Sequence, residues 1–157
     1  MATEETKESD VFEPFRKDFP MLIEAGFVAV KQLDGICAQR IFQAAQMLSP
    51  ENVAPKVGMG YIALNKLELK EGKRIFQEVL EKEPDNWLAQ TFLGICYLLS
   101  KSKQSHGEKL IQEAMEKSDD PTIVNLGKVS LEWAEKDLKK MKSPFFQTDG
   151  APSKEES

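Results

Sequence analysis

Small and apolar residues recur along this chain at a spacing far longer than one helical turn. Gly26, Gly60 and Gly94 are separated by 34 residues each. Three further positions keep the same phase, and this agreement indicates an internal repeat. The further pairs are Phe42 and Phe76, Pro50 and Pro84, and the small residues Ala38 and Gly72.

A 34-residue period with glycine at position 8, a small residue at position 20, phenylalanine at 24 and proline at 32 is typical of tetratricopeptide repeats, in which two helices form a hairpin. The small residues let the two helices approach closely, and the phenylalanine fills the space between hairpins. The proline ends the second helix because it cannot continue one. The sequence therefore predicts an all-α solenoid of three repeats, at 19–52, 53–86 and 87–120.

The ends of the array depart from this pattern. Gly107 follows Gly72 by 35 residues, which predicts one inserted residue in the turn near 101–103. A last helix over 121–142 is expected to cap the open face of the solenoid. Residues 1–18 are predicted to form a flexible extension, and 143–157 a disordered tail.

Residues 11–19 contain three phenylalanines, so two interpretations of this segment stay open. The segment either docks, on the first repeat or on a partner, or forms a frayed linker.

In such an array the first helix of each repeat lines the concave surface, and positions 5, 9 and 12 share one face of that helix. Leu88, at position 2, extends the same surface. All but one of the side chains are apolar or aromatic. The predicted groove consists of Ile23, Phe27 and Val30, then Val57, Tyr61 and Leu64, and finally Leu88, Thr91, Ile95 and Leu98.

A groove this apolar is unfavourable in water, since large exposed apolar patches are rare on monomers. We expect it to bind an apolar helix of another protein or of a second copy. Burying one Val, Leu, Ile or Phe side chain yields about 1.5–3 kcal/mol, so five or six anchors would offset about 4–15 kcal/mol of association cost. The alternative is that some of these side chains form the core. The Lys, Arg and Asn residues of a carboxylate clamp are absent from these positions.

Length, composition and charge narrow the classes of function. The 157 residues suit one domain, and 41% hydrophobic with 30% charged residues is ordinary for a globular protein. The net charge of -5 belongs to the ends, because residues 20–142 hold 17 acidic and 17 basic side chains. Without a basic stripe we expect no nucleic-acid partner. No apolar run predicts a membrane span or a secretory signal, so we expect a cytoplasmic location without membrane contact.

Residues for catalysis or metal binding are scarce. His106 is the single histidine, so no His/Cys cluster could bind a metal, and we expect it at the surface. Cys37 and Cys96 lie in helical patterns and are predicted to be buried structural thiols. The chain has no phosphate-binding loop, nucleophile elbow or His-Glu-x-x-His motif. We therefore expect no enzymatic activity and no cofactor.

Three segments resemble the tetratricopeptide chaperones of type III secretion needle subunits: 84–89, 95–97 and, above all, the Ser-Asp-Asp-Pro-Thr-Ile junction within 117–123. The resemblance covers residues 20–140 loosely and 84–138 best. It implies a bacterial cytoplasmic chaperone that keeps a self-polymerising needle subunit monomeric by burying its amphipathic helix in the groove. It also implies a small helical co-chaperone as a further partner.

Two other functions remain open at this point. One is a chaperone of a type III secretion translocator; such a chaperone would bind an extended segment of its client, the protein that it keeps from associating too early. The other is a scaffold that joins two folded proteins through its charged convex faces. Without its partner, a chain with an exposed apolar groove is expected to self-associate.

Overall fold

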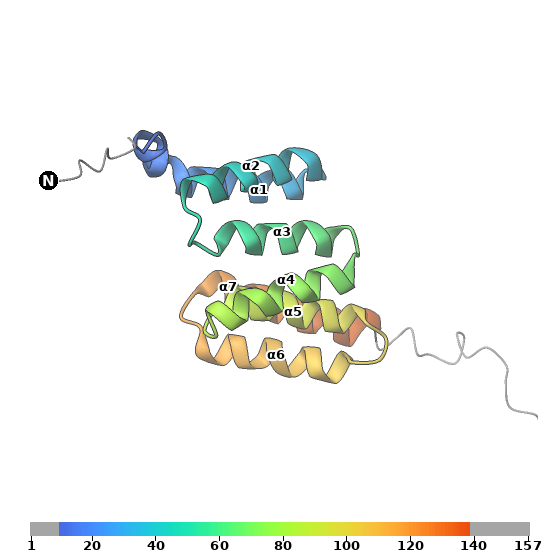
Figure 1. Ribbon diagram of the computed structural model, residues 1–157. Helices are drawn as coiled ribbons and strands as arrows, with labels where there is room; N and C mark the ends of the chain where they lie inside the picture. Colours follow the sequence, from blue (N-terminus) through green and yellow to red (C-terminus); the bar gives the residue numbers. More distant parts are fainter. Residues whose placement is uncertain (1–9, 139–157) are drawn as a thin grey trace, which may run out of the picture.

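The computed structural model describes residues 10–138, and within that range the chain is helical without strands (Figure 1). The predicted all-α class is therefore confirmed for the described residues. A 3-10 helix, η1 (Glu13–Asp18), precedes the α-helices, and a π-helical turn, η2 (Ala134–Leu138), follows them. The α-helices are α1 (Phe19–Lys31), α2 (Gly35–Leu48), α3 (Ala54–Asn65), α4 (Leu69–Lys82), α5 (Trp87–Leu99), α6 (Gln104–Lys117) and α7 (Pro121–Trp133).

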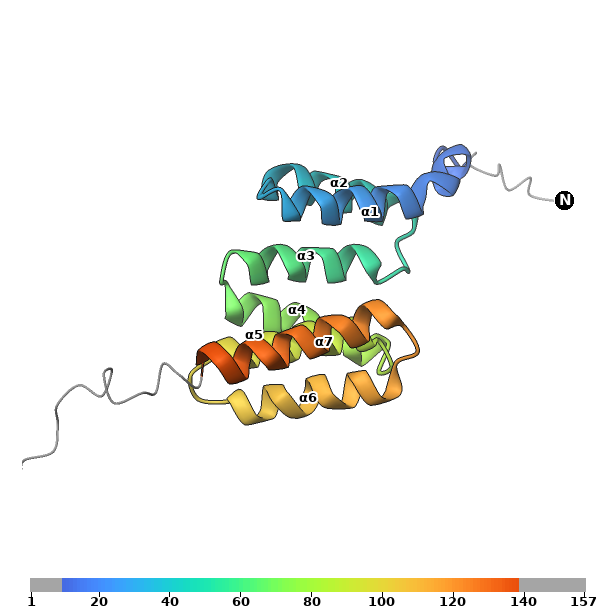
Figure 2. The same ribbon diagram turned by 180° about the vertical axis from the view of Figure 1, so that it is seen from behind.

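Consecutive helices form three hairpins, α1 with α2, α3 with α4, and α5 with α6, and these hairpins stack along one direction (Figure 1). Helix α7 lies last, against α5 and α6; Figure 2 shows it in front of α5. The turns within the first two hairpins, 32–34 and 66–68, have three residues each. The third turn, 100–103, has four, and the extra residue falls where the sequence predicts an insertion.

Side-chain caps and prolines define where several helices begin. The Asp34 carboxylate accepts a hydrogen bond from the Cys37 N–H at 2.9 Å, and the Asn86 side chain accepts one from Ala89 at 3.0 Å. Asp120 caps α7 through the Thr122 N–H at 2.8 Å. Each cap satisfies a backbone donor that has no partner within its own helix.

Glycines allow the two helices of the third hairpin to touch. A Cβ atom added to Gly107 would lie 2.5 Å from the Gly94 carbonyl oxygen. A Cβ on Gly94 would in turn lie 2.6 Å from the Ile111 side chain. Both separations are shorter than real contacts allow, so glycine at these two positions sets the distance between α5 and α6.

Phenylalanine rings join one hairpin to the next. Phe42, on α2, is fully buried, and its ring occupies the space beside Gly26 on α1 and Gly58 on α3. Phe76, on α4, is also fully buried, with its ring centroid 5.5 Å from that of Phe92 on α5. The rings thus bridge successive hairpins, as their 34-residue spacing led us to expect.

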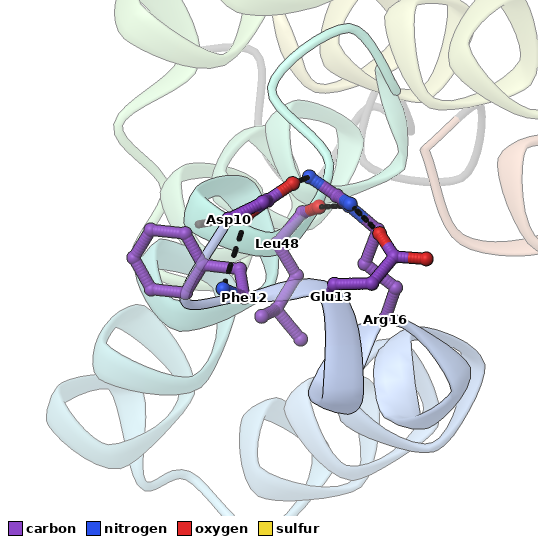
Figure 3. Close-up of polar contacts among 5 residues, drawn as sticks. All are labelled: Asp10, Phe12, Glu13, Arg16 and Leu48. Atoms are coloured by element: carbon purple, nitrogen blue, oxygen red, sulfur yellow. Dashed lines mark hydrogen bonds and ion pairs between the residues drawn. The ribbon is translucent and has the colours of Figure 1, made fainter. Parts of the chain in front are cut away.

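The segment before α1 is more ordered than predicted. Residues 13–18 form η1, which contacts α1 and α2 instead of remaining flexible. Arg16 forms ion pairs with Asp10 and Glu13, and its Nε donates a hydrogen bond to the Leu48 carbonyl oxygen at 3.3 Å (Figure 3). Of the two interpretations of residues 11–19, docking on the first hairpin therefore applies to η1.

The remaining predictions for the chain ends lie outside the described residues. These are the start of the flexible extension at 1–9, the last part of the helix predicted over 121–142, and the disordered tail at 143–157. Within the described residues, α7 ends at Trp133 and the chain continues through η2 to Leu138.

Both cysteines were predicted to be buried, but only one of them is. Cys96 is fully buried in α5, and burial raises the pKa of its thiol to about 11. Cys37 is exposed, so its predicted burial is wrong. It lies in the first turn of α2, outside the face of the helix that carries the buried residues Ala38, Phe42, Ala45 and Leu48. His106 is exposed, with its ring 4.7 Å from that of Tyr97.

Candidate binding groove

Four helices that are not neighbours in sequence enclose one apolar hollow, which we call the groove. Its volume is about 780 Å³, and its side chains come from α1, α3, α5 and α7, except for Leu67 in the turn after α3. Eleven of its fifteen residues are apolar or aromatic, and Lys31 is its one charged residue. The lining consists of Phe27, Lys31, Tyr61, Leu64, Asn65, Leu67, Leu88, Phe92, Ile95, Leu99, Thr122, Asn125, Leu126, Val129 and Trp133.

A line of aromatic rings connects the first three of these helices. The centroid of the Phe27 ring on α1 lies 5.6 Å from that of Tyr61 on α3. The Tyr61 ring stacks on Phe92 of α5, with centroids 4.9 Å apart. Contacts at these distances stabilise aromatic pairs beyond the burial of their area. The floor of the groove is therefore continuous from α1 to α5.

Helix α7 contributes two large apolar side chains that remain exposed in the groove. Val129 is 54% exposed and Trp133 is 38% exposed. The Asp120 cap and Pro121 fix where α7 begins. From that start, an α-helix places Thr122, Asn125, Leu126, Val129 and Trp133 along one face, because their spacings are three or four residues.

The structure brings together half of the predicted groove residues. Five of them line the groove: Phe27, Tyr61, Leu64, Leu88 and Ile95. Ile23 and Val57 instead line a smaller hollow of about 300 Å³, which shares Phe27 and Leu88 with the groove.

The other three predicted residues require a correction, because they belong to the core. Val30 is 3% exposed and lies in a cluster with Ala38 and Phe42 of α2. Leu98 is 1% exposed and clusters with Ile111 of α6. Thr91 is fully buried, and its hydroxyl donates a hydrogen bond to the Trp87 carbonyl oxygen at 2.7 Å. Val30 and Leu98 therefore face the second helix of their own hairpin.

The sequence prediction chose a helix face that is rotated away from the groove. Most lining residues of α1, α3 and α5 lie at repeat positions 2, 6, 9 and 13, whereas the prediction used positions 5, 9 and 12. Each residue turns an α-helix by about 100°, so the centres of these two faces differ by a rotation of about 60° around the helix axis. Position 9 is common to both faces, so Phe27, Tyr61 and Ile95 belong to both. Positions 5 and 12 are divided: Leu64 lines the groove, Ile23 and Val57 line the smaller hollow, and Val30, Thr91 and Leu98 are buried.

The residues that the sequence prediction missed follow the same 34-residue spacing. Val129 lies 34 residues after Ile95, and Trp133 lies 34 residues after Leu99. Lys31, Asn65, Leu99 and Trp133 form one such series, and each is the last residue of its helix. The signal that could have identified α7 as part of the groove is therefore the repeat period itself, continued past residue 120.

A second large hollow has a different character. It measures about 880 Å³, lies against α4, and is lined largely by charged side chains, among them Glu68, Lys73 and Arg74. Arg74 is paired with Glu71 and Glu78. The hydrogen bond from Lys56 and the nearby Arg74 lower the pKa of Glu78, so that carboxylate is charged near neutral pH.

The described residues offer little to a metal ion. Within 10–138, no three His, Cys, Asp or Glu side chains converge as a metal site would need. Over the same range, no helix is both long enough and apolar enough to cross a bilayer.

Together, the fold and the groove define a protein that is helical over its described residues and has one large apolar groove. The chain belongs to the bacterial type III secretion protein family HrpB1_HrpK, whose model matches residues 19–132, more than two thirds of its length. The matched region includes α1 to α6 and nearly all of α7. No curated protein and no solved structure matches the chain.

Proposed function

We propose that this protein is a non-enzymatic chaperone of the type III secretion system, with the fold of a three-repeat tetratricopeptide solenoid, and that its groove binds an amphipathic helix of the needle subunit. The family supports the secretion system as the setting. The observation that carries the proposal is the groove: eleven apolar or aromatic side chains, ten of them from four helices, around about 780 Å³. A needle subunit that polymerises through an apolar helix would be kept monomeric by burial of that helix here, in the bacterial cytoplasm.

The exposed part of the groove indicates where the client helix would gain most. Val129 and Trp133 are still about half and one third exposed, and large apolar side chains that meet water usually mark an interaction surface. An amphipathic helix lays an apolar face into such a groove through residues spaced three or four apart. The single charge of the lining, on Lys31 at the end of α1, leaves the remaining surface for apolar contacts.

A matched pair of valines provides the test. Val129 lines the groove and is 54% exposed, whereas Val28, on α1, is 50% exposed and lies outside the groove. We expect Val129→Glu to abolish co-purification of the needle subunit expressed with the chain, because a carboxylate would be buried without a partner. Val28→Glu should leave the complex intact.

Both substitutions introduce the same charge at similar exposure, so their effects on folding should be small and alike. Circular dichroism would check that helix content is unchanged. Equal retention of the needle subunit by both variants would show that the groove is not its binding site. A needle subunit that never co-purifies with the unaltered chain would contradict the proposed client.

A further inference from the structure

The described part of the chain ends close to one end of the groove. The last residues of α1, α3, α5 and α7 all line one end of the groove, which includes Lys31, Leu99 and Trp133. The chain leaves α7 at this same end, through η2 to Leu138. Both views show this end of α7 beside the turn between α5 and α6 (Figures 1 and 2).

The sequence after Leu138 contains one apolar cluster in a polar stretch. Met141, Phe145 and Phe146 are the large apolar side chains of residues 139–157. Phe145 follows Leu138 by seven residues, which span at most about 25 Å when fully extended. Trp133 precedes Leu138 by five residues, a rise of about 7.5 Å along a helix. The two phenylalanines can therefore reach back into the groove.

We propose that residues 141–146 dock in the groove of the same molecule and cover Val129 and Trp133 until a client replaces them. This segment would shield the apolar surface that α7 exposes. Docking does not depend on the identity of the client, but the regulatory consequence, competition with the needle helix, rests on the proposed function. A segment tethered to its site acts at an effective concentration of millimolar order, so weak contacts suffice.

Trp133 reports on docking directly, because it lines the groove. In a Trp87→Phe background it is the single tryptophan of the chain. We expect the full-length protein to show blue-shifted Trp133 emission and slow acrylamide quenching. Replacing both phenylalanines, Phe145→Ser with Phe146→Ser, should shift the emission to the red and increase the quenching constant at least twofold.

Two controls separate docking from other causes. Gln147→Ala with Thr148→Ala alters the neighbouring polar residues and should change neither signal. Dilution of the full-length protein over a hundredfold range should also leave the emission unchanged, since the proposed contact lies within one molecule. Identical emission and quenching with and without the phenylalanines would overturn the proposal. Emission that depends on protein concentration would also overturn it, because the segment would then come from a second copy.

Affinity for the needle subunit tests the regulatory consequence. If the segment fills the groove in nine molecules of ten, its removal should strengthen binding about tenfold. The Phe145→Ser, Phe146→Ser variant should therefore bind more tightly than the unaltered chain, and unchanged affinity would contradict competition. A Trp133 shift without any binding of the needle subunit would support docking while refuting the proposed function, so the two failures are distinguishable.

Discussion

Helices α1 and α5 are both the first helices of their hairpins and both have 13 residues, yet they differ greatly in burial. Nine residues of α5 are buried, but only three of α1. Helix α5 contacts α3 and α4 on one side and α6 and α7 on the other, whereas α1 contacts η1, α2 and α3. Met21 and Val28 of α1 consequently remain 66% and 50% exposed. In a stacked array, position in the stack therefore decides how much of a repeated pattern is buried.

A large effect is expected where the two helices of the third hairpin lie closest together. Gly107→Ala would place a methyl group 2.5 Å from the Gly94 carbonyl oxygen, and backbone cannot move aside as a side chain can. We expect a loss of about 3 kcal/mol in the free energy of unfolding, at the upper end of what overpacking usually costs. Urea denaturation followed by circular dichroism would measure it.

Gly35→Ala is the matched substitution in the end hairpin. Its added methyl group would meet the Lys66 side chain at 3.4 Å, which is ordinary contact. The free energy of unfolding should change by less than about 1 kcal/mol. Similar losses for the two variants would contradict the close approach of α5 and α6.

A second prediction concerns how the two hairpins open. Amide hydrogens of α1 and α2 should exchange through local opening, while those of α5 should exchange only on global unfolding. Phe42→Ala removes the ring that joins α1 and α2 to α3 and should cost about 3–5 kcal/mol, with faster exchange concentrated in the first hairpin. Equal exchange rates in the first and third hairpins would show that local stability does not follow the burial of the helices.

Substitutions in the turns are expected to stabilise the protein, by a smaller amount. Leu33 and Leu67 occupy equivalent turns with φ of 62° and 59°, a left-handed conformation that costs a leucine about 1–2 kcal/mol. Leu33 is 85% exposed, so Leu33→Asn should raise the free energy of unfolding by about 0.5–1 kcal/mol. Leu67→Asn should relieve the same strain but weaken client binding, because Leu67 lines the groove. Thermal melting would measure the change, and a lower melting temperature for Leu33→Asn would show that the turn is not strained.

The smallest effect is expected from acid. The Lys56 hydrogen bond lowers the pKa of Glu78 below its ordinary value near 4.5. The folded pKa therefore lies below the unfolded one, so the ion pair stabilises the fold above about pH 4.5 and loses this contribution as the pH falls. Because the pair is exposed, its effect should be slight. Between pH 7 and pH 3, the urea concentration at the midpoint of unfolding should fall less for Glu78→Gln than for the unaltered chain. An equal fall in both proteins would show that the pair of Lys56 and Glu78 does not stabilise the fold.

The sequence predicted the helices well because the 34-residue spacing fixes which residues must be small and which must fill space between hairpins. It predicted the groove only in part. Position 9 is correct for Phe27, Tyr61 and Ile95, but whether positions 5 and 12 face the groove or the core depends on how far each helix is rotated about its axis. That rotation is set by contacts between hairpins, such as the ring of Phe42 beside Gly58, which periodicity alone does not reveal. Helix α7 was treated as a cap, although the continued spacing of Val129 and Trp133 places it in the groove.

Protection of a thiol placed in the groove would show whether the client helix binds there. Cys37 is exposed and would be replaced by serine, whereas Cys96 is buried with a raised pKa and reacts slowly. In that background, Val129→Cys and Val28→Cys each provide one reactive thiol, inside and outside the groove. We predict that the needle subunit slows alkylation of the thiol at position 129 at least tenfold and leaves position 28 unchanged. Equal alkylation rates at position 129 with and without bound needle subunit would contradict the account.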